Sequence, residues 1–149
     1  MNALISLGNR ILNLSHSCTW LPPLLARITV GVVFFQSGLG KVNNLERVTG
    51  YFASLGLPAP AFQAMLVGWT ELIAGLLLII GLATRLAAIP LTIIMIVAIR
   101  TALSEDVTDF SSLAGATEYL YIVLMMWLMV AGPGKVALDA LVAKRFRSR

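Results

Sequence analysis

The sequence predicts an all-α integral membrane protein built as a four-transmembrane-helix bundle. Of its 149 residues, 58% are hydrophobic and only 12% are charged, and the mean hydropathy is +0.89, far from the mixture typical of soluble domains. Four apolar stretches approach the roughly 20 residues that an α-helix needs to cross a bilayer. We therefore expect a single membrane domain with spans at residues 21–40, 61–83, 86–103 and 113–132.

The first span begins beside Trp20 and two prolines, which a helix tolerates in its first turn. Five of its residues recur at spacings of four and three, so they share one helix face. Small residues on such a face allow close helix approach inside a bundle. The residues of this face are Arg27, Gly31, Phe34, Gly38 and Lys41.

The chain between the first two spans, residues 43–56, is too polar to cross a membrane but has apolar residues at helical spacing. We expect a short amphipathic segment at the interface. In the second span, Glu71 is the one ionisable residue between Ala61 and Ala83. A charge at mid-bilayer costs roughly 2.5 to 3.5 kcal/mol on insertion scales, so it is expected to face the bundle interior and to have a partner.

The third span contains Pro90 and Arg100, and the fourth carries Glu118 near its start. An acidic loop, residues 104–112, joins them, and a basic segment, residues 133–149, follows the last span. The N-terminal segment, the second loop and the tail hold most cations, so the positive-inside rule places both termini in the cytoplasm. These cations are Arg10, Arg85, Lys135, Lys144, Arg145, Arg147 and Arg149.

Helix rise gives each buried charge an approximate depth, at about 1.5 Å per residue. Arg100 and Glu118 are matched in depth on consecutive antiparallel helices, so we predict that they form an ion pair. Arg27 and Glu71 form the second predicted pair, with Arg100 as the competing partner of Glu71. Such pairs either fix helix register or mark a ligand or proton pathway, and the sequence leaves both roles open.

The residues before the first span include few candidate catalytic or ligand-binding side chains. Residues 5–14 form a short amphipathic helix or a frayed tail, and Cys18 is expected to be an inert thiol. His16 is the single histidine, so paired axial histidines for a b-type haem are absent. No CxxC pair, nucleotide-binding glycine motif or metal-ligand cluster occurs, so an independent enzyme and a metal site are not indicated.

Several short motifs appear in a characteristic order: LLARITVGVVFFQSGLGKV, YFASLGLPAP, VGWTELIAGLLLIIGLATRLAAIPL and GPGKVALDAL. Together they cover residues 24–141 and resemble the DoxX family of small bacterial inner-membrane proteins. The resemblance implies a four-helix membrane protein linked to redox functions, such as a subunit of a thiosulfate to quinone oxidoreductase or oxidative-stress defence. The family often has His just before the glycine of the first motif, where this chain has Ser37, and this departure weakens haem or metal ligation there.

The leading hypothesis is a redox-linked accessory subunit with a polar pocket among apolar walls, suited to a quinone or a similar small ligand. Its charges would come from Arg27, Lys41, Glu71, Arg100 and Glu118, and its lining from Ser37, Trp69 and Tyr121. The main alternative is a non-enzymatic structural or partner-binding membrane protein, and a small transporter is a third option. Expected partners are membrane lipids and a redox protein, with a homo-oligomer left open; the basic tail beside a membrane segment favours lipid headgroups over nucleic acid.

Overall fold

The computed structural model describes residues 19–147, and this part of the chain is helical without strands. The predicted N-terminal helix at residues 5–14, His16 and Cys18 lie outside the described residues. The helices are α2 (Leu21–Asn43), α3 (Leu45–Ser54), α4 (Pro60–Ile80), α5 (Thr84–Thr101), α6 (Phe110–Gly115), α7 (Thr117–Ala131) and α8 (Leu138–Arg147).

Three of these helices, α2, α4 and α5, are long and apolar enough to cross a membrane, and α7 is a shorter apolar helix. The predicted class, a helical membrane bundle, is confirmed. The region expected to form one last span is instead divided: α6 ends at Gly115, and α7 starts after Ala116, whose backbone is extended. A capping box between Asp109 and Ser112 starts α6 at Phe110, and the extended backbone of Ala116 interrupts the helical run, so no single helix covers residues 113–132.

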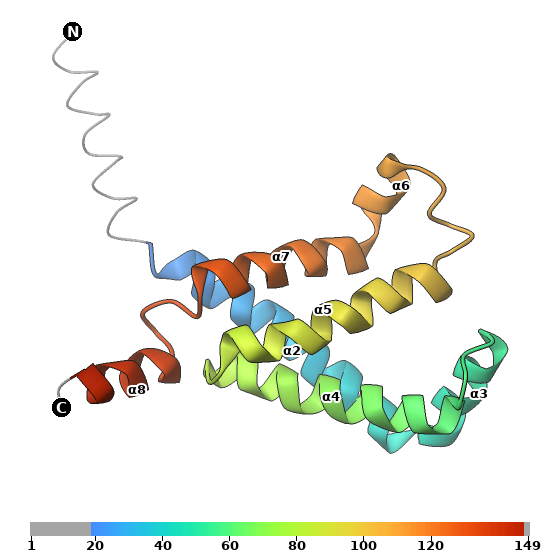
Figure 1. Ribbon diagram of the computed structural model, residues 1–149, viewed down its shortest axis with the longest axis horizontal. Coiled ribbons are helices and arrows are strands. Elements are labelled where there is room, and N and C mark those ends of the chain that lie inside the picture. The colour runs from blue at the N-terminus through green and yellow to red at the C-terminus, as the bar shows by residue number, and fades with distance from the viewer. Residues whose placement is uncertain (1–18, 148–149) are drawn as a thin grey trace, which may run out of the picture.

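The closest helix pair is α2 with α4, which cross in the lower half of Figure 1. Glycines at the contact have no room for a side chain. A Cβ on Gly31 would lie 2.9 Å from the backbone nitrogen of Ile79, and one on Gly38 would lie 2.7 Å from the Cα of Leu72. Gly75 on α4 is equally tight against the Phe35 backbone. These small residues let the two backbones approach, as the pattern on the first span predicts.

The bundle has two arms: the first is α2 and α4, with α3 packed against α4, and the second is α5 and α7. The core lies between these two arms. Its buried members include Phe34 of α2, Leu78 of α4, Leu91 of α5 and Met125 of α7. Met125 is fully buried, so it packs in the core as expected for a flexible thioether that fills gaps. The core thus ties all four apolar helices together.

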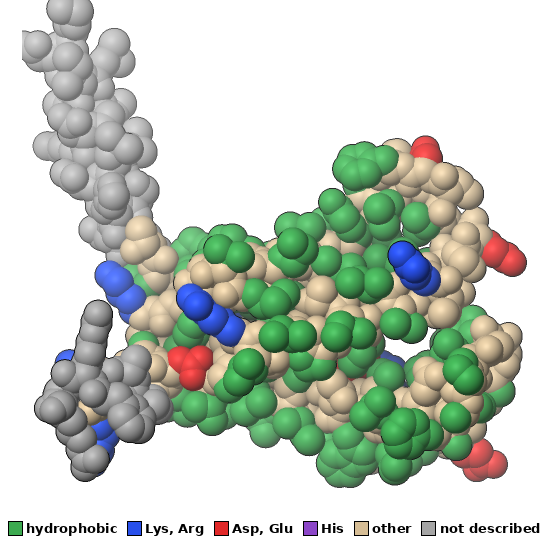
Figure 2. Space-filling view, in the orientation of Figure 1, with side chains coloured by type: hydrophobic (Ala, Val, Ile, Leu, Met, Phe, Trp, Pro, Cys, Tyr) green, Lys and Arg blue, Asp and Glu red, His purple; other side chains and the backbone are tan. Residues whose placement is uncertain are grey.

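The two arms diverge toward the end of the bundle that carries α3 and α6, away from α8 (Figure 1). The space-filling view shows an indentation on this side, between the arm of α5 to α7 and the arm of α3 and α4 (Figure 2). The short helix α3 packs against α4. This arrangement opens a pocket between the arms.

Candidate ligand pocket

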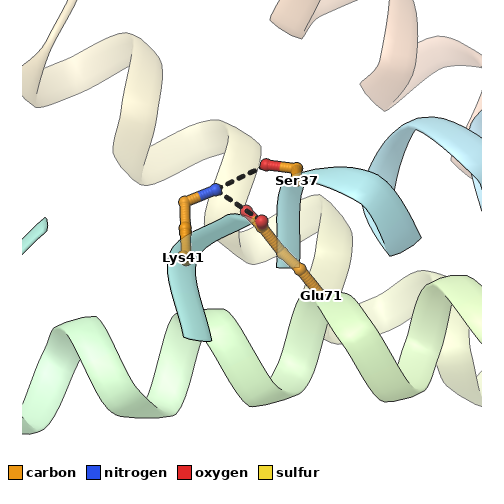
Figure 3. Close-up of polar contacts among 3 residues, drawn as sticks. All are labelled: Ser37, Lys41 and Glu71. Carbon is orange, nitrogen blue, oxygen red and sulfur yellow. Dashed lines mark hydrogen bonds and ion pairs between the residues drawn. The ribbon is translucent and has the colours of Figure 1, made fainter. Parts of the chain in front are cut away.

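A buried carboxylate and an ammonium group meet between α2 and α4 (Figure 3). Lys41 Nζ lies 2.5 Å from Glu71 Oε2 and donates a second hydrogen bond, 2.6 Å long, to Ser37 Oγ. Ser37 and Lys41 are four residues apart on α2, so helical periodicity places both on the face that meets α4. The Glu71 side chain is 2% exposed and that of Lys41 is 24% exposed. Lys41 therefore neutralises the buried charge while its own side chain stays partly accessible.

This cluster forms part of the wall of a cavity of about 320 Å³ between the two arms. The walls come from five helices and are mostly apolar, with Phe34, Phe52, Met95 and Ala98 among them. Tyr121 of α7 also lines the cavity, and its ring packs on Phe34 at a centroid distance of 5.7 Å. An apolar cavity of a few hundred Å³ with a few convergent polar groups is the usual form of a small-molecule site.

Five of the predicted site residues line this cavity: Ser37, Lys41, Glu71, Glu118 and Tyr121. The other three lie elsewhere. Arg100 is exposed, Arg27 is buried at the opposite end of α2, and Trp69 lines a separate apolar groove between α4 and α5. Tyr51 and Gln63, which were not among the predicted site residues, line the cavity where α3 meets α4. The amphipathic pattern of residues 43–56 was the signal that could have placed α3 at this site.

Both predicted ion pairs are wrong. Glu71 is paired with Lys41, not with Arg27 or Arg100. Among the described residues no ion pair joins Arg100 to Glu118, because the exposed Arg100 side chain is not turned into the bundle. The register of α2 against α4 explains the first error: Gly38 lies against Leu72, which places Lys41 beside Glu71. Arg27 lies against Gly81 instead, too far along the helix to reach Glu71.

Arg27 has a different role, at the end of the bundle near α8. Arg27 is 3% exposed, and its guanidinium donates hydrogen bonds to the carbonyl oxygens of Pro133 (2.9 Å) and Val136 (2.7 Å). It also interacts electrostatically with Asp139. Asp139 in turn accepts hydrogen bonds from the backbone N–H groups of Ala83 (2.7 Å) and Thr84 (3.1 Å), at the start of α5. Arg27 thus fastens the chain after α7 to α2, and Asp139 fastens it to the turn between α4 and α5.

The fold and the pocket define a small helical membrane protein with a buried Lys41–Glu71 pair at the wall of an apolar cavity. The DoxX family matches residues 23–104, and the chain belongs to this family. The resemblance drawn from the sequence motifs is confirmed. No solved structure matches the chain at a significant level.

Relatives match over most of their length. The chain is 34% identical to the Bacillus subtilis protein named "Putative oxidoreductase CatD", over 81% of this chain and 87% of that protein. It is 35% identical to the uncharacterised membrane protein Rv3486 of Mycobacterium tuberculosis, over 83% and 84%. The inner membrane protein YphA of Escherichia coli is 29% identical over 78% and 86%. The chain is therefore similar to each of these three proteins over more than four fifths of that protein's length.

Proposed function

We propose that this DoxX-family protein is a redox-linked accessory subunit that binds a quinone, or a ring compound with similar carbonyl groups, in the cavity between the two arms. The observation that carries the proposal is the Ser37–Lys41–Glu71 cluster at the wall of an otherwise mostly apolar cavity. The name of the Bacillus subtilis relative supports a redox role. As an accessory subunit, the protein would hold the ligand while a partner exchanges electrons with it.

The chemistry of the cluster suits such a ligand. A quinone carbonyl accepts hydrogen bonds, and the Lys41 ammonium has three N–H donors, of which Ser37 and Glu71 take two. A quinol carries two hydroxyl protons, and the carboxylates of Glu71 and Glu118 are acceptors on the cavity wall. The rings of Phe34 and Tyr121 supply apolar contact area for the ligand ring. The cavity thus offers groups complementary to both the oxidised and the reduced form.

The proposed setting is the bacterial inner membrane with both termini in the cytoplasm. The Lys and Arg residues before and within α8, together with Arg85 in the first turn of α5, support this orientation. The cavity would then open toward the outer side of the membrane, where α3 and the acidic loop lie. A redox partner would then bind on the outer side of the membrane.

The test is the amount of quinone that the purified full-length protein retains in mild detergent. Ala98→Phe fills the cavity without changing a charge, and Ala61→Phe adds the same bulk at an exposed position on α4 as a matched control. We expect wild type and Ala61→Phe to retain quinone, and Ala98→Phe to lose most of it. If wild type neither retains quinone nor binds an added short-chain benzoquinone, the proposed function is overturned.

A further inference from the structure

A second cavity, of about 570 Å³, lies at the end of the bundle that carries α8. It is formed by the turn between α4 and α5 and by the chain that follows α7. Residues of its wall include Ala83, Arg85, Leu86, Gly132, Lys135 and Asp139. None of these residues lines the proposed quinone cavity, so this site is separate from it.

The free hydrogen-bond donors at this cavity are cationic. Arg85 is exposed and one of its Nη atoms donates a 3.3 Å hydrogen bond to the Val130 carbonyl, which leaves most of the guanidinium available. The exposed Lys135 ammonium makes no hydrogen bond or ion pair to any described residue. Asp139 also lies on the wall, but its two carboxylate oxygens accept from the N–H groups of Ala83 and Thr84. An anion with several oxygens, such as a phosphate, is therefore the complementary ligand.

An apolar groove of about 600 Å³ continues from this cavity along α4 and α5. Ala83 and Leu86 line both spaces, so the groove and the basic cavity adjoin. Small residues, Ala74 and Ala87, are buried at the floor, while exposed Trp69 forms part of the rim. The groove follows α4 from Leu77 back to Phe62, about 22 Å at the helix rise, which exceeds the ~15 Å of one leaflet, half of the hydrocarbon core.

The geometry points to a binding site for one anionic glycerophospholipid, with its phosphate between Arg85 and Lys135 and an acyl chain in the α4–α5 groove. A phospholipid has this same division, with a charged group at the interface and a tail within the hydrocarbon. Basic pockets between membrane helices are known to hold anionic headgroups. The inference does not depend on the proposed quinone site.

Native mass spectrometry of the detergent-purified full-length protein tests the site. Binding of dioleoyl phosphatidylglycerol is compared with binding of dioleoyl phosphatidylcholine and of dihexanoyl phosphatidylglycerol. Inorganic phosphate is then added as a competitor of dioleoyl phosphatidylglycerol. The variant pair Arg85→Gln with Lys135→Gln removes the two cations. Arg47→Gln with Arg100→Gln also removes two positive charges, from exposed positions at the opposite end of the bundle, and serves as the matched control.

We expect one dioleoyl phosphatidylglycerol per chain, with phosphatidylcholine and the dihexanoyl lipid both weaker. The Arg85→Gln, Lys135→Gln variant should bind about 25-fold more weakly, about fivefold for each cation, while the control variant and the thermal unfolding temperature stay near wild type. Equal binding of phosphatidylcholine, or no effect of the two substitutions, overturns the proposal. If inorganic phosphate competes with the lipid, and binding of phosphatidylglycerol does not depend on the length of its acyl chains, the site binds a free anion and not a phospholipid. A stable dimer that binds no phosphatidylglycerol would place a second copy of the chain in the groove, and would also overturn it.

Discussion

Lys41 and Glu71 join α2 to α4 through an ion pair of 2.5 Å between Nζ and Oε2, in which the carboxylate is buried and the ammonium is partly exposed. Removal of Lys41 alone leaves an uncompensated charge, and the loss of one partner from a buried pair costs several kcal/mol. Since Lys41 is partly exposed, we predict a smaller loss for Lys41→Met, about 2 kcal/mol in unfolding free energy. Equilibrium unfolding of wild type and variant in detergent measures this loss of unfolding free energy.

The pairing itself is tested by a second substitution in the same background. Glu71→Gln removes the unpaired charge, so the double variant should be more stable than Lys41→Met alone. Lys144→Met makes the same change at an exposed position and should be neutral. If the double variant loses the full sum of the two single effects, the two residues are not energetically coupled.

The Arg27 guanidinium makes two hydrogen bonds to backbone carbonyls, at Pro133 and Val136. A lysine cannot reproduce this forked geometry, so Arg27→Lys should release the chain after α7 although the charge remains. We predict a loss of about 1 to 3 kcal/mol, the range for unsatisfied buried hydrogen-bonding groups. Trypsin cleavage after Lys135 should become faster than in wild type. Unchanged cleavage relative to an Arg47→Lys control would argue against the fastening role.

Two glycine substitutions separate close packing from helix propensity. In Gly38→Ala the new methyl would meet the Leu72 backbone, which cannot move aside as a side chain can. We predict a loss of about 3 kcal/mol, toward the upper end of overpacking effects. Gly40→Ala, two residues along α2, meets no atom within 4 Å and should gain up to about 1 kcal/mol. Equal unfolding midpoints for the two variants would contradict the close approach of α2 and α4.

The start of α6 should depend on pH. The Ser112 backbone and side chain donate hydrogen bonds to the Asp109 carboxylate and hold the pKa of this group below its usual value. Because the folded-state pKa is the lower one, this stabilisation is complete above the unfolded pKa of about 3.9 and is lost as the pH falls through the folded value. Amide exchange protection of Phe110–Gly115 should therefore drop below about pH 4. Asp109→Asn should show no such step, while Asp106→Asn should keep it.

The sequence predicted the helical membrane class because apolar length and the spacing of glycines are local properties of the chain. The face with Arg27, Gly31, Phe34 and Gly38 is buried as periodicity requires. The ion pairs were mispredicted because depth along a helix does not determine register between helices. That register depends on where Gly38 and Gly75 allow contact, and long side chains such as Arg27 can turn toward loop carbonyls that a depth estimate ignores.

The most direct test of the central claim is the position of a bound quinone. The full-length protein is irradiated with a photoreactive short-chain benzoquinone, and labelled peptides are mapped. Labels are expected at residues 51–57 of the α3 region, at 94–102 of α5 and around Tyr121, and Ala98→Phe should remove most of them. Labels confined to the α4–α5 groove around Trp69 and Leu86, unchanged by Ala98→Phe, would contradict the account.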